Sequence, residues 1–437
     1  MIKVGKLTIN EVDGAGVRRL IFPLSASRGV WLSGDRLIFE LPLQFEKLKN
    51  IGEAVAFSLL PIAYVHKTHI QLPKDLYIEP GTQERIYEIC SLWNKWFYMR
   101  RQVKIHADIN DAIFPCSDNR YGVQLFSGGI DSLATFMRHR EDIKSLVFFR
   151  GADIPVTRVE RFREVKKNIL HFAKRYSKEF IALTTNVHDL SDVSWLRVAQ
   201  SCAIISPLLM LASYIDKIYI ASSFFGKAGM KLPWGSHPNL DPLIRCESVE
   251  IIHDGFELKR TEKTLLVSSE PQLLRVTRVC NGNIVGQMNC GKCEKCYRTR
   301  LIFILLGLEE DIKSFPDRSI SLHTISEFLK KETFPAYEKI FWCDNLEFLE
   351  SSPLPAQGKA QLIATLKDKL GPFYEDYKKG FPQGLPAELE YISKLRKVEK
   401  KLRLKPDSLT WIKKFIRSLR GLPHRNFIRE HARFHRV

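Results

Sequence analysis

Residues 120–310 alternate between short apolar runs and longer stretches in which apolar residues recur with a helical period. Continuous apolar runs predict buried strands, and a spacing of three to four residues predicts helices. The predicted strands are VQLF (123–126), SLVFF (145–149), FIALTT (180–185) and KIYIAS (217–222). The predicted helices lie at about 131–140, 156–176 and 195–214. This alternation predicts an α/β fold with a parallel sheet that is covered on both faces.

The flanking residues follow other patterns. Residues 1–115 contain short runs with strand character, such as KVGKLTI and RLIFELPL, separated by turn residues, and then two helical patterns. They predict a β-rich α+β domain that ends near FPCSDNRYG (114–122). Residues 311–437 are mostly helical in pattern, with Pro/Gly breaks. We therefore expect three domains, 1–115, 116–310 and 311–437.

The positive charge of the chain is concentrated at its C-terminal end. The formal net charge is +18, and residues 391–437 contain 15 Lys/Arg and 3 Asp/Glu, which leaves 15 − 3 = +12 in this segment. Within it, residues 409–422 place apolar and basic side chains largely on different sides of a helix. We expect the tail to contact an anionic partner: a nucleic acid, a membrane surface or an acidic protein. The alternative is a helix docked on its own protein.

The sequence shows neither a secretory signal nor a membrane-spanning stretch, and both observations bear on where in the cell the protein is located. The first residues lack the apolar core of a secretory signal, and the longest apolar stretches are too short to span a bilayer. An odd number of cysteines, nine, in a chain without such a signal argues against a disulfide framework. We expect a cytoplasmic protein without a transmembrane segment.

Residues 125–132 read LFSGGIDS and lie between the first predicted strand and the first predicted helix. Glycines let a backbone approach a phosphate closely, and the N-terminus of a helix attracts anions. The hydroxyl groups of Ser127 and Ser132 add donors. Asp131 would repel a bare phosphate, and is explained if it holds Mg²⁺ or caps the helix. The alternative is an ordinary tight turn.

The SGGIDS stretch closely resembles the SGGxDS signature of the PP-loop, or N-type, ATP pyrophosphatases. In that family the loop binds the phosphates of ATP, a substrate oxygen is adenylated, and pyrophosphate leaves. The resemblance implies a PP-loop fold, with ATP and Mg²⁺ as cofactors. The positions that match the signature are Ser127, Gly128, Gly129, Asp131 and Ser132.

Further polar residues follow the predicted strands. Arg150 comes after the second strand and Asn186 after the third. In parallel sheets ligands bind at the carboxyl ends of the strands, so both residues are candidates to line a nucleotide cleft. Each could equally be a cap or turn residue.

Four cysteines fall within CNGNIVGQMNCGKCEKC, with the spacing C-x9-C-x2-C-x2-C. Four thiolates suit a tetrahedral Zn²⁺ and leave no open position, so the site would be structural. An iron–sulfur cluster is the competing occupant. The predicted ligands are Cys280, Cys290, Cys293 and Cys296.

This cysteine spacing, near the end of a PP-loop-like segment, resembles the 7-cyano-7-deazaguanine synthases. Those enzymes use ATP to activate a deazaguanine carboxylate, which ammonia converts through an amide to a nitrile. The resemblance covers roughly residues 120–305. The chain departs from that family by about 115 residues before this segment and about 130 after it. These additions suggest a different acceptor, such as a protein or another macromolecule. Relatives that modify a protein amine and sugar amidotransferases of the same superfamily are precedents.

The long connection after the fourth predicted strand, residues 226–245, is where we expect a second substrate. It contains His237 and Asp241. Arg260 and Lys263 follow on the first turns of a predicted helix, where they could neutralise a carboxylate or the α-phosphate of ATP. Loop-stabilising contacts and surface ion pairs are the alternative for all four residues.

The sequence favours an ATP-dependent ligase or amidotransferase that forms AMP and pyrophosphate. A carboxylate-bearing substrate would be adenylated and then attacked by an amine or ammonia, with Asp131, Arg260 and Lys263 as catalytic residues. A tRNA-modifying enzyme or a sugar amidotransferase is an alternative within this class. The alternative outside it is a non-catalytic nucleotide sensor whose basic tail carries the binding function.

Overall fold

The computed structural model describes residues 1–12, 14, 16–110, 119–282, 284–309, 312–317, 319–353 and 358–380. The chain divides into two compact units, Met1–Ser319 and Ile320–Val437. The predicted amphipathic tail segment 409–422 and most of the predicted boundary 114–122 lie outside the described residues. Among the described residues, no helix combines the length and the apolar character needed to cross a membrane.

The first unit is built on one large sheet, in which the described residues form 11 strands. Five neighbouring strands are parallel and run in the order 13-12-9-10-11. They are β9 (Tyr121–Leu125), β10 (Ile143–Arg150), β11 (Glu179–Thr185), β12 (Ile215–Ala221) and β13 (Glu250–Asp254). The predicted α/β architecture with a mostly parallel central sheet is thereby confirmed. The chain leaves β9 toward β10 and later returns to its other side with β12, so the crevice of the sheet lies at the carboxyl end of β9.

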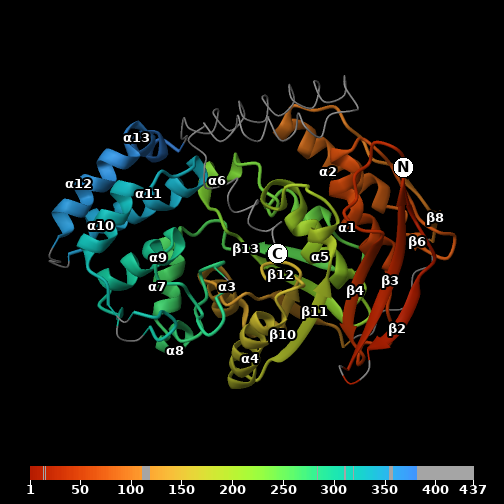
Figure 1. Ribbon diagram of the computed structural model, residues 1–437, viewed down its shortest axis with the longest axis horizontal. Coiled ribbons are helices and arrows are strands. Elements are labelled where there is room, and N and C mark those ends of the chain that lie inside the picture. Colours follow the sequence, from red (N-terminus) through yellow and green to blue (C-terminus); the bar gives the residue numbers. More distant parts are fainter. Residues whose placement is uncertain are drawn as a thin grey trace. The chain divides into compact units, whose positions relative to one another are not determined.

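Helices cover both faces of this sheet (Figure 1). One face carries α3 (Ile130–His139), α4 (Val159–Arg175), α7 (Arg260–Ser268), α8 (Pro271–Leu274) and α9 (Glu294–Leu305). The other face carries α1 (Ile51–Val65), α2 (Thr82–Phe97) and α5 (Gln200–Leu209). Aromatic packing fixes α3 and α4 over β9: the rings of Phe126 and Phe172 stack at 4.9 Å, and Phe136 meets Phe172 edge-on at 5.1 Å. This core holds the start of α3 at the crevice.

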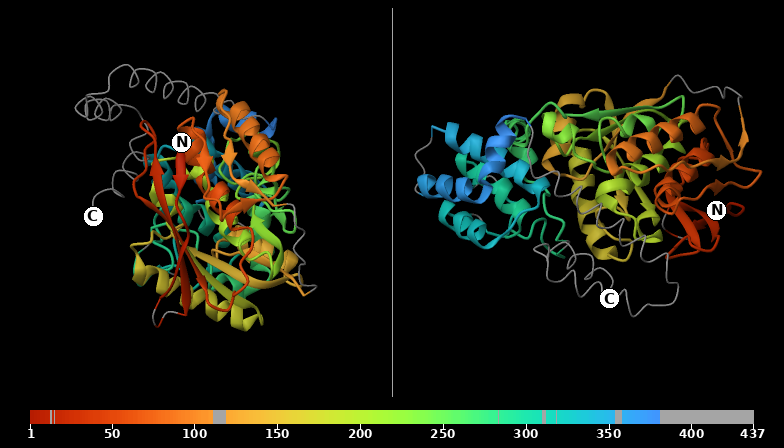
Figure 2. Two further views of the ribbon diagram at one scale, coloured as in Figure 1. Left: turned by 90° about the vertical axis from the view of Figure 1, so that its right-hand side faces the viewer. Right: turned by 90° about the horizontal axis from the view of Figure 1, so that it is seen from above.

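The N-terminal residues extend the same sheet (Figures 1 and 2). Strand β4 (Arg36–Pro42) pairs antiparallel with β11, through Thr184↔Glu40 and Thr185↔Phe39. The strands beyond β4 are β1 (Ile2–Val4), β2 (Thr8–Val12), β3 (Val17–Ala26), β5 (Ile70–Gln71) and β7 (Ile105–His106). A separate small pair is formed by β6 (Tyr77–Ile78) and β8 (Asp108–Ile109). The segments expected as 1–115 and 116–310 thus share one sheet within one compact unit.

The described residues of the second unit, 320–353 and 358–380, are mostly helical. They contain α10 (Leu322–Lys331), α11 (Ala336–Ser351), α12 (Lys359–Leu370) and α13 (Pro372–Lys378), drawn from cyan to blue in Figure 2. Helix α10 begins at Ser321, whose hydroxyl accepts the N–H of Thr324 at 3.1 Å. Buried leucines between the helices, such as Leu346 and Leu366, form its core.

A buried carboxyl group lies in α1. Glu53 is only 1 % exposed, and its Oε1 accepts hydrogen bonds from the N–H of Glu79 at 2.5 Å and from Oγ1 of Thr82 at 3.2 Å. Burial outweighs these hydrogen bonds and raises the pKa of Glu53 from 4.5 to about 7. The folded chain therefore keeps a proton that the unfolded chain releases between these two pH values.

We expect Glu53→Gln to become increasingly stable relative to the parent chain as the pH rises from 5 to 8. The raised folded-state pKa means that the parent loses stability as the pH rises through this window, whereas glutamine has no proton to lose. Since one pKa unit corresponds to about 1.4 kcal/mol, the advantage should grow by about 2 to 3 kcal/mol, measured by urea unfolding at both pH values. Glu84→Gln, at an exposed position of α2, is the control. An advantage of Glu53→Gln that does not change with pH would contradict this expectation.

Candidate functional site

The loop that joins β9 to α3 has the geometry of an anion site. Gly128 has φ +74°, a left-handed conformation that favours glycine, and a Cβ there would lie 3.2 Å from the carbonyl oxygen of Val276. Gly129 is the N-cap of α3 and offers no side chain to cover the first N–H groups of the helix. The hydroxyl of Ser132 donates to the Gly129 carbonyl at 2.9 Å, and Ser127 Oγ accepts the Gly129 N–H at 3.3 Å. The loop is thus ordered by its own serines, and its helix N-terminus carries partial positive charge.

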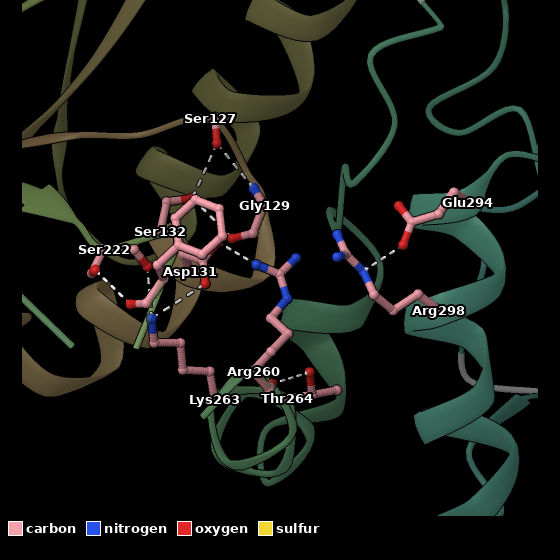
Figure 3. A network of polar contacts seen from close by, with 11 residues as sticks. Ser127, Gly129, Asp131, Ser132, Ser222, Arg260, Lys263, Thr264, Glu294 and Arg298 are labelled. Carbon is pink, nitrogen blue, oxygen red and sulfur yellow. Dashed lines mark hydrogen bonds and ion pairs between the residues drawn. The ribbon is translucent and has the colours of Figure 1, made fainter. Parts of the chain in front are cut away.

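Asp131 lies in the first turn of α3 and joins this loop to α7. Its carboxylate forms ion pairs with Arg260 through Oδ2 and with Lys263 through Oδ1, the latter at 3.4 Å (Figure 3). Burial pushes the pKa of Asp131 upward, but the two positive charges outweigh it and hold the pKa below its ordinary value. The interpretation of Asp131 as a helix cap is wrong, because the N-cap is Gly129 and α3 has no side-chain cap.

Lys263 is almost fully buried, with 2 % of its side chain exposed. Its Nζ donates to the carbonyl oxygen of Ser222, at the carboxyl end of β12, at 2.6 Å. Burial lowers the pKa of Lys263, and the charge of Asp131 offsets only part of that effect. Helix α7 presents both cations at its start because Arg260 and Lys263 are three residues apart and share one side of the helix. The N–H of Lys259 is satisfied by Glu262 Oε2 at 2.7 Å, which fixes this first turn.

A fourth segment, distant in sequence, brings a further cation to the glycine loop. The N–H of Arg278 donates to the carbonyl oxygen of Gly128 at 2.8 Å. The Arg278 side chain is 2 % exposed, and its Nη1 has only long contacts of 3.5 Å, to the Ser127 carbonyl and to Asp153. Its Nε and Nη2 are buried and have no hydrogen-bond partner among the described residues. Two unsatisfied charged donors beside a helix N-terminus point to an anion as the missing partner.

Arg298 approaches the same site from α9. Its side chain is 5 % exposed, its Nε lies 3.4 Å from Glu294 Oε1, and it points from α9 toward the side on which Arg260 lies (Figure 3). Three buried cations, Arg260, Lys263 and Arg278, thus contact the loop or the first turn of its helix, and Arg298 points toward Arg260 in Figure 3. Asp131 compensates Arg260 and Lys263, whereas Arg278 has only a long contact to Asp153, so a bound anion would offset buried charge chiefly at Arg278.

The four predicted cysteine ligands come together. Their Sγ atoms all lie within 4.8 Å of one another, with Cys293 to Cys296 at 3.4 Å and Cys290 to Cys296 at 3.8 Å. Zinc–sulfur bonds of about 2.3 Å place the corners of a tetrahedron about 3.8 Å apart, so the cluster could hold a metal ion such as zinc. Hydrogen bonds from Cys293 and Cys296 hold the pKa of the Cys280 thiol below its ordinary value, which favours the thiolate that binds metals.

One buried asparagine stabilises the backbone beside this cysteine cluster through four hydrogen bonds. Asn289 is 1 % exposed, and its Oδ1 accepts the N–H groups of Val279 and Cys280 at 2.8 and 3.2 Å. Its Nδ2 donates to the carbonyl oxygens of Thr277 and Ser314 at 2.8 and 2.9 Å. The same short segment, 277–280, therefore carries a cysteine ligand and Arg278, which links the cysteine cluster physically to the glycine loop.

Two residues that were expected to line the cleft have their polar groups engaged elsewhere. The guanidinium of Arg150 donates to the carbonyl oxygen of Val156, with Nε at 2.9 Å, and so fixes the turn after β10. The amide of Asn186 bridges to β4: its Oδ1 accepts the Ile38 N–H and its Nδ2 donates to the Arg36 carbonyl, both at 2.8 Å. Both side chains are held by the protein rather than left open at the crevice.

His237 and Asp241 lie together in the connection between β12 and β13, which also contains α6 (Gly226–Met230). Both ring nitrogens of His237 are used: Nε2 donates to the Met230 carbonyl at 3.1 Å, and Nδ1 accepts the Asn239 N–H at 3.0 Å. Burial lowers the pKa of His237, so the neutral ring is favoured. Asp241 is fully buried and accepts the His237 N–H at 2.9 Å.

Sequence reasoning missed three features of this site. Strand β13, EIIHD, was not predicted because it has too few apolar residues to form a run. Arg278 could have been suspected only from its position two residues before Cys280. Asn289 gave no signal, because a buried asparagine in a loop looks like a turn residue in the sequence.

Comparisons with protein-family models, with curated proteins and with solved structures found no match to this chain. The resemblance to the ATP pyrophosphatases therefore depends on the residues of the chain itself.

Proposed function

We propose that this protein is an ATP-dependent ligase of the PP-loop type, which forms AMP and pyrophosphate. The observation that supports this best is the group of buried cations around the glycine loop. In particular, Arg278 has two buried guanidinium nitrogens without partners, next to the N-terminus of α3. A polyphosphate is the anion that can occupy a glycine-rich helix N-terminus and several cations at once.

In the proposed reaction, a carboxylate oxygen of the substrate attacks the α-phosphorus of ATP, and the bond to the β-phosphate breaks. Arg278 and the N-terminus of α3 bind the leaving pyrophosphate. Arg260 and Lys263 neutralise the charge that develops on the α-phosphate, and Asp131 holds both cations in position. An amine or ammonia then attacks the acyl carbon and AMP leaves. Positioning and electrostatics supply the catalysis, without a protein nucleophile.

The two implied metals fit the chain differently. The four cysteine sulfurs suit Zn²⁺, which would hold Arg278 and Arg298 in place and would take no part in the chemistry. At the glycine loop, Asp131 is already paired with two cations, so no protein site for Mg²⁺ is ready there. Mg²⁺ would enter on the phosphates of ATP, which are its usual ligands.

The substrate class follows from the resemblance to the 7-cyano-7-deazaguanine synthases. A deazaguanine carboxylate is therefore the first probe for the adenylated substrate. The remaining parts of the chain, including the basic segment 391–437, support an acceptor larger than ammonia or a second, anionic partner.

The decisive experiment incubates the full chain with ATP-Mg²⁺, 7-carboxy-7-deazaguanine and ammonium, and measures AMP, pyrophosphate and ATP–pyrophosphate exchange. We expect both products and exchange, and we expect Asp131→Asn to reduce the rate at least about 100-fold because Arg260 and Lys263 lose their common partner. Glu141→Gln, just beyond α3 and with 94 % of its side chain exposed, is the matched control. Nucleotide binding without exchange would support the sensor instead, and the absence of nucleotide binding would overturn the proposal.

A further inference from the structure

A buried aspartate–histidine pair lies at the same edge of the sheet. Asp241 is 0 % exposed, and its carboxylate has four hydrogen-bond donors around it. They are Ser201 Oγ at 2.6 Å, Ser236 Oγ at 2.8 Å, the His237 N–H at 2.9 Å and His253 Nδ1 at 2.7 Å. Four donors satisfy the oxygens of this carboxyl group even though it is buried.

The pair leaves one nitrogen of His253 without a protein partner. In the neutral ring with Nδ1–H donating to Asp241, the second nitrogen, Nε2, holds a lone pair. Only 3 % of the His253 side chain is exposed, and Nε2 is buried without a hydrogen-bond partner among the described residues. His237, only 2 % exposed, differs in that both of its nitrogens are satisfied. An unsatisfied buried acceptor is unfavourable in a purely structural histidine, and indicates that a ligand N–H or O–H completes the site.

The backbone that follows His253 lies close to Lys263, one of the cations at the glycine loop. It is the penultimate residue of β13, beside Ile220 of β12, at the carboxyl ends of both strands. Gly255, two residues later, packs against the Lys263 side chain: a Cβ added to this glycine would lie 3.2 Å from Cε of Lys263. Asp254, between them, points to the α3 face and accepts from Thr135 Oγ1 at 2.7 Å, so His253 faces the opposite side, toward the connection 222–249. The pair therefore lies at the carboxyl ends of β12 and β13, on the face of the sheet away from α3.

We propose that His253 is the proton acceptor for the amine nucleophile and that Asp241 is its positioning residue. This inference rests on the proposed ligase activity and adds the site of the second substrate. The amine nitrogen binds with one N–H directed at Nε2 of His253 and attacks the acyl carbon of the adenylate. The carbon–nitrogen bond forms, the carbon–oxygen bond to AMP breaks, and Nε2 takes the proton that the nitrogen loses. The products are the amide, AMP and an imidazolium that returns its proton to water.

The first test separates the two half-reactions with the same probes, ATP-Mg²⁺, 7-carboxy-7-deazaguanine and ammonium. We expect His253→Gln to leave ATP–pyrophosphate exchange within about 3-fold of the parent. Amide formation should fall about 100- to 10,000-fold, the usual contribution of a general base. His171→Gln, at an exposed position of α4, is the control and should change neither rate. A loss of exchange equal to the loss of amide formation would overturn the role of His253 in the second step.

The second test needs no turnover and remains decisive if exchange is absent in the parent chain. In the full chain labelled with ¹⁵N-histidine, the signal that disappears in His253→Gln is assigned to His253. We expect a protonated Nδ1 and an unprotonated Nε2 whose shift moves on addition of methylamine but not of sodium chloride. Asp241→Asn should reverse the tautomer, because an amide NH₂ donates to Nδ1 instead of accepting from it. A proton on Nε2 in the parent, or no response to methylamine, would overturn the inference even if the ligase activity is found.

Discussion

We expect Arg278→Gln to weaken binding of ATP and of pyrophosphate roughly 10- to 100-fold without destabilising the unliganded protein. Hydrogen bonds from a charged group contribute about 1.5 to 3 kcal/mol each, which corresponds to this range of affinity. In the unliganded chain the Arg278 side chain is buried with only long contacts, to Asp153 and to the Ser127 carbonyl. Removing a poorly paired buried charge is neutral or stabilising, so affinity and stability should change in opposite directions.

Isothermal titration with ATP and with inorganic pyrophosphate measures the affinity of Arg278→Gln, and urea unfolding measures the stability of the same variant. Arg275→Gln is the matched control, because Arg275 is an exposed residue at the end of α8, three positions away. It should leave the affinity within about 2-fold of the parent. If Arg278→Gln lost stability by several kcal/mol, or if Arg275→Gln weakened binding equally, Arg278 would be a structural residue and the anion site would lose its main support.

The second large effect is expected from removal of the metal. The purified chain should contain one equivalent of zinc, and Cys296→Ser should lose it together with about 10 °C of thermal stability. Cys296 is the most central ligand, since its sulfur lies 3.4 Å from Cys293 and 3.8 Å from Cys290. Without the metal, only weak hydrogen bonds to sulfur compensate for the burial of Cys280 and Cys296.

Loss of the metal should also weaken anion binding at the glycine loop. Arg278 precedes the first cysteine ligand by two residues, and Arg298 follows the last one by two residues. We expect Cys296→Ser to weaken pyrophosphate binding at least as much as Arg278→Gln does. Elemental analysis, thermal unfolding and titration with pyrophosphate check this. Lys292→Gln, at an exposed position between the ligands, should change none of the three. Iron in place of zinc would identify the competing iron–sulfur cluster, and a stable metal-free protein with full affinity would contradict the coupling.

The strand, loop and helix around SGGIDS were predictable because each depends on residues close in sequence. The apolar run predicts β9, the glycines and serines predict a tight loop, and the period of SLATFM predicts α3. The four cysteines were predictable for the same reason: a ligand spacing of two residues brings neighbouring thiols together in one turn. Arg260 and Lys263 were found by their spacing on a predicted helix, although their common partner, Asp131, was not foreseen.

Other residues show where local patterns fail. Arg150 and Asn186 follow strands, as cleft residues do, yet their side chains bond to Val156 and to the backbone of β4. The direction of Asn186 depends on the pairing of β4 with β11, which joins segments about 145 residues apart, whereas Arg150 is held by the turn that follows its own strand. His253 was missed because β13 has too short an apolar run, and its pairing with β12 is what makes it a strand.

The sequence by itself determined the α/β alternation, the glycine loop and the cysteine ligands, because these features depend on propensity, period and spacing over a few residues. Only the tertiary structure decided that Arg278 reaches Gly128, that Asp131 pairs with two cations of α7, and that Asp241 orients His253. Those contacts join segments between 12 and 150 residues apart. They depend on strand order and helix packing, which arise from burial of the whole core and leave no local signal in the chain.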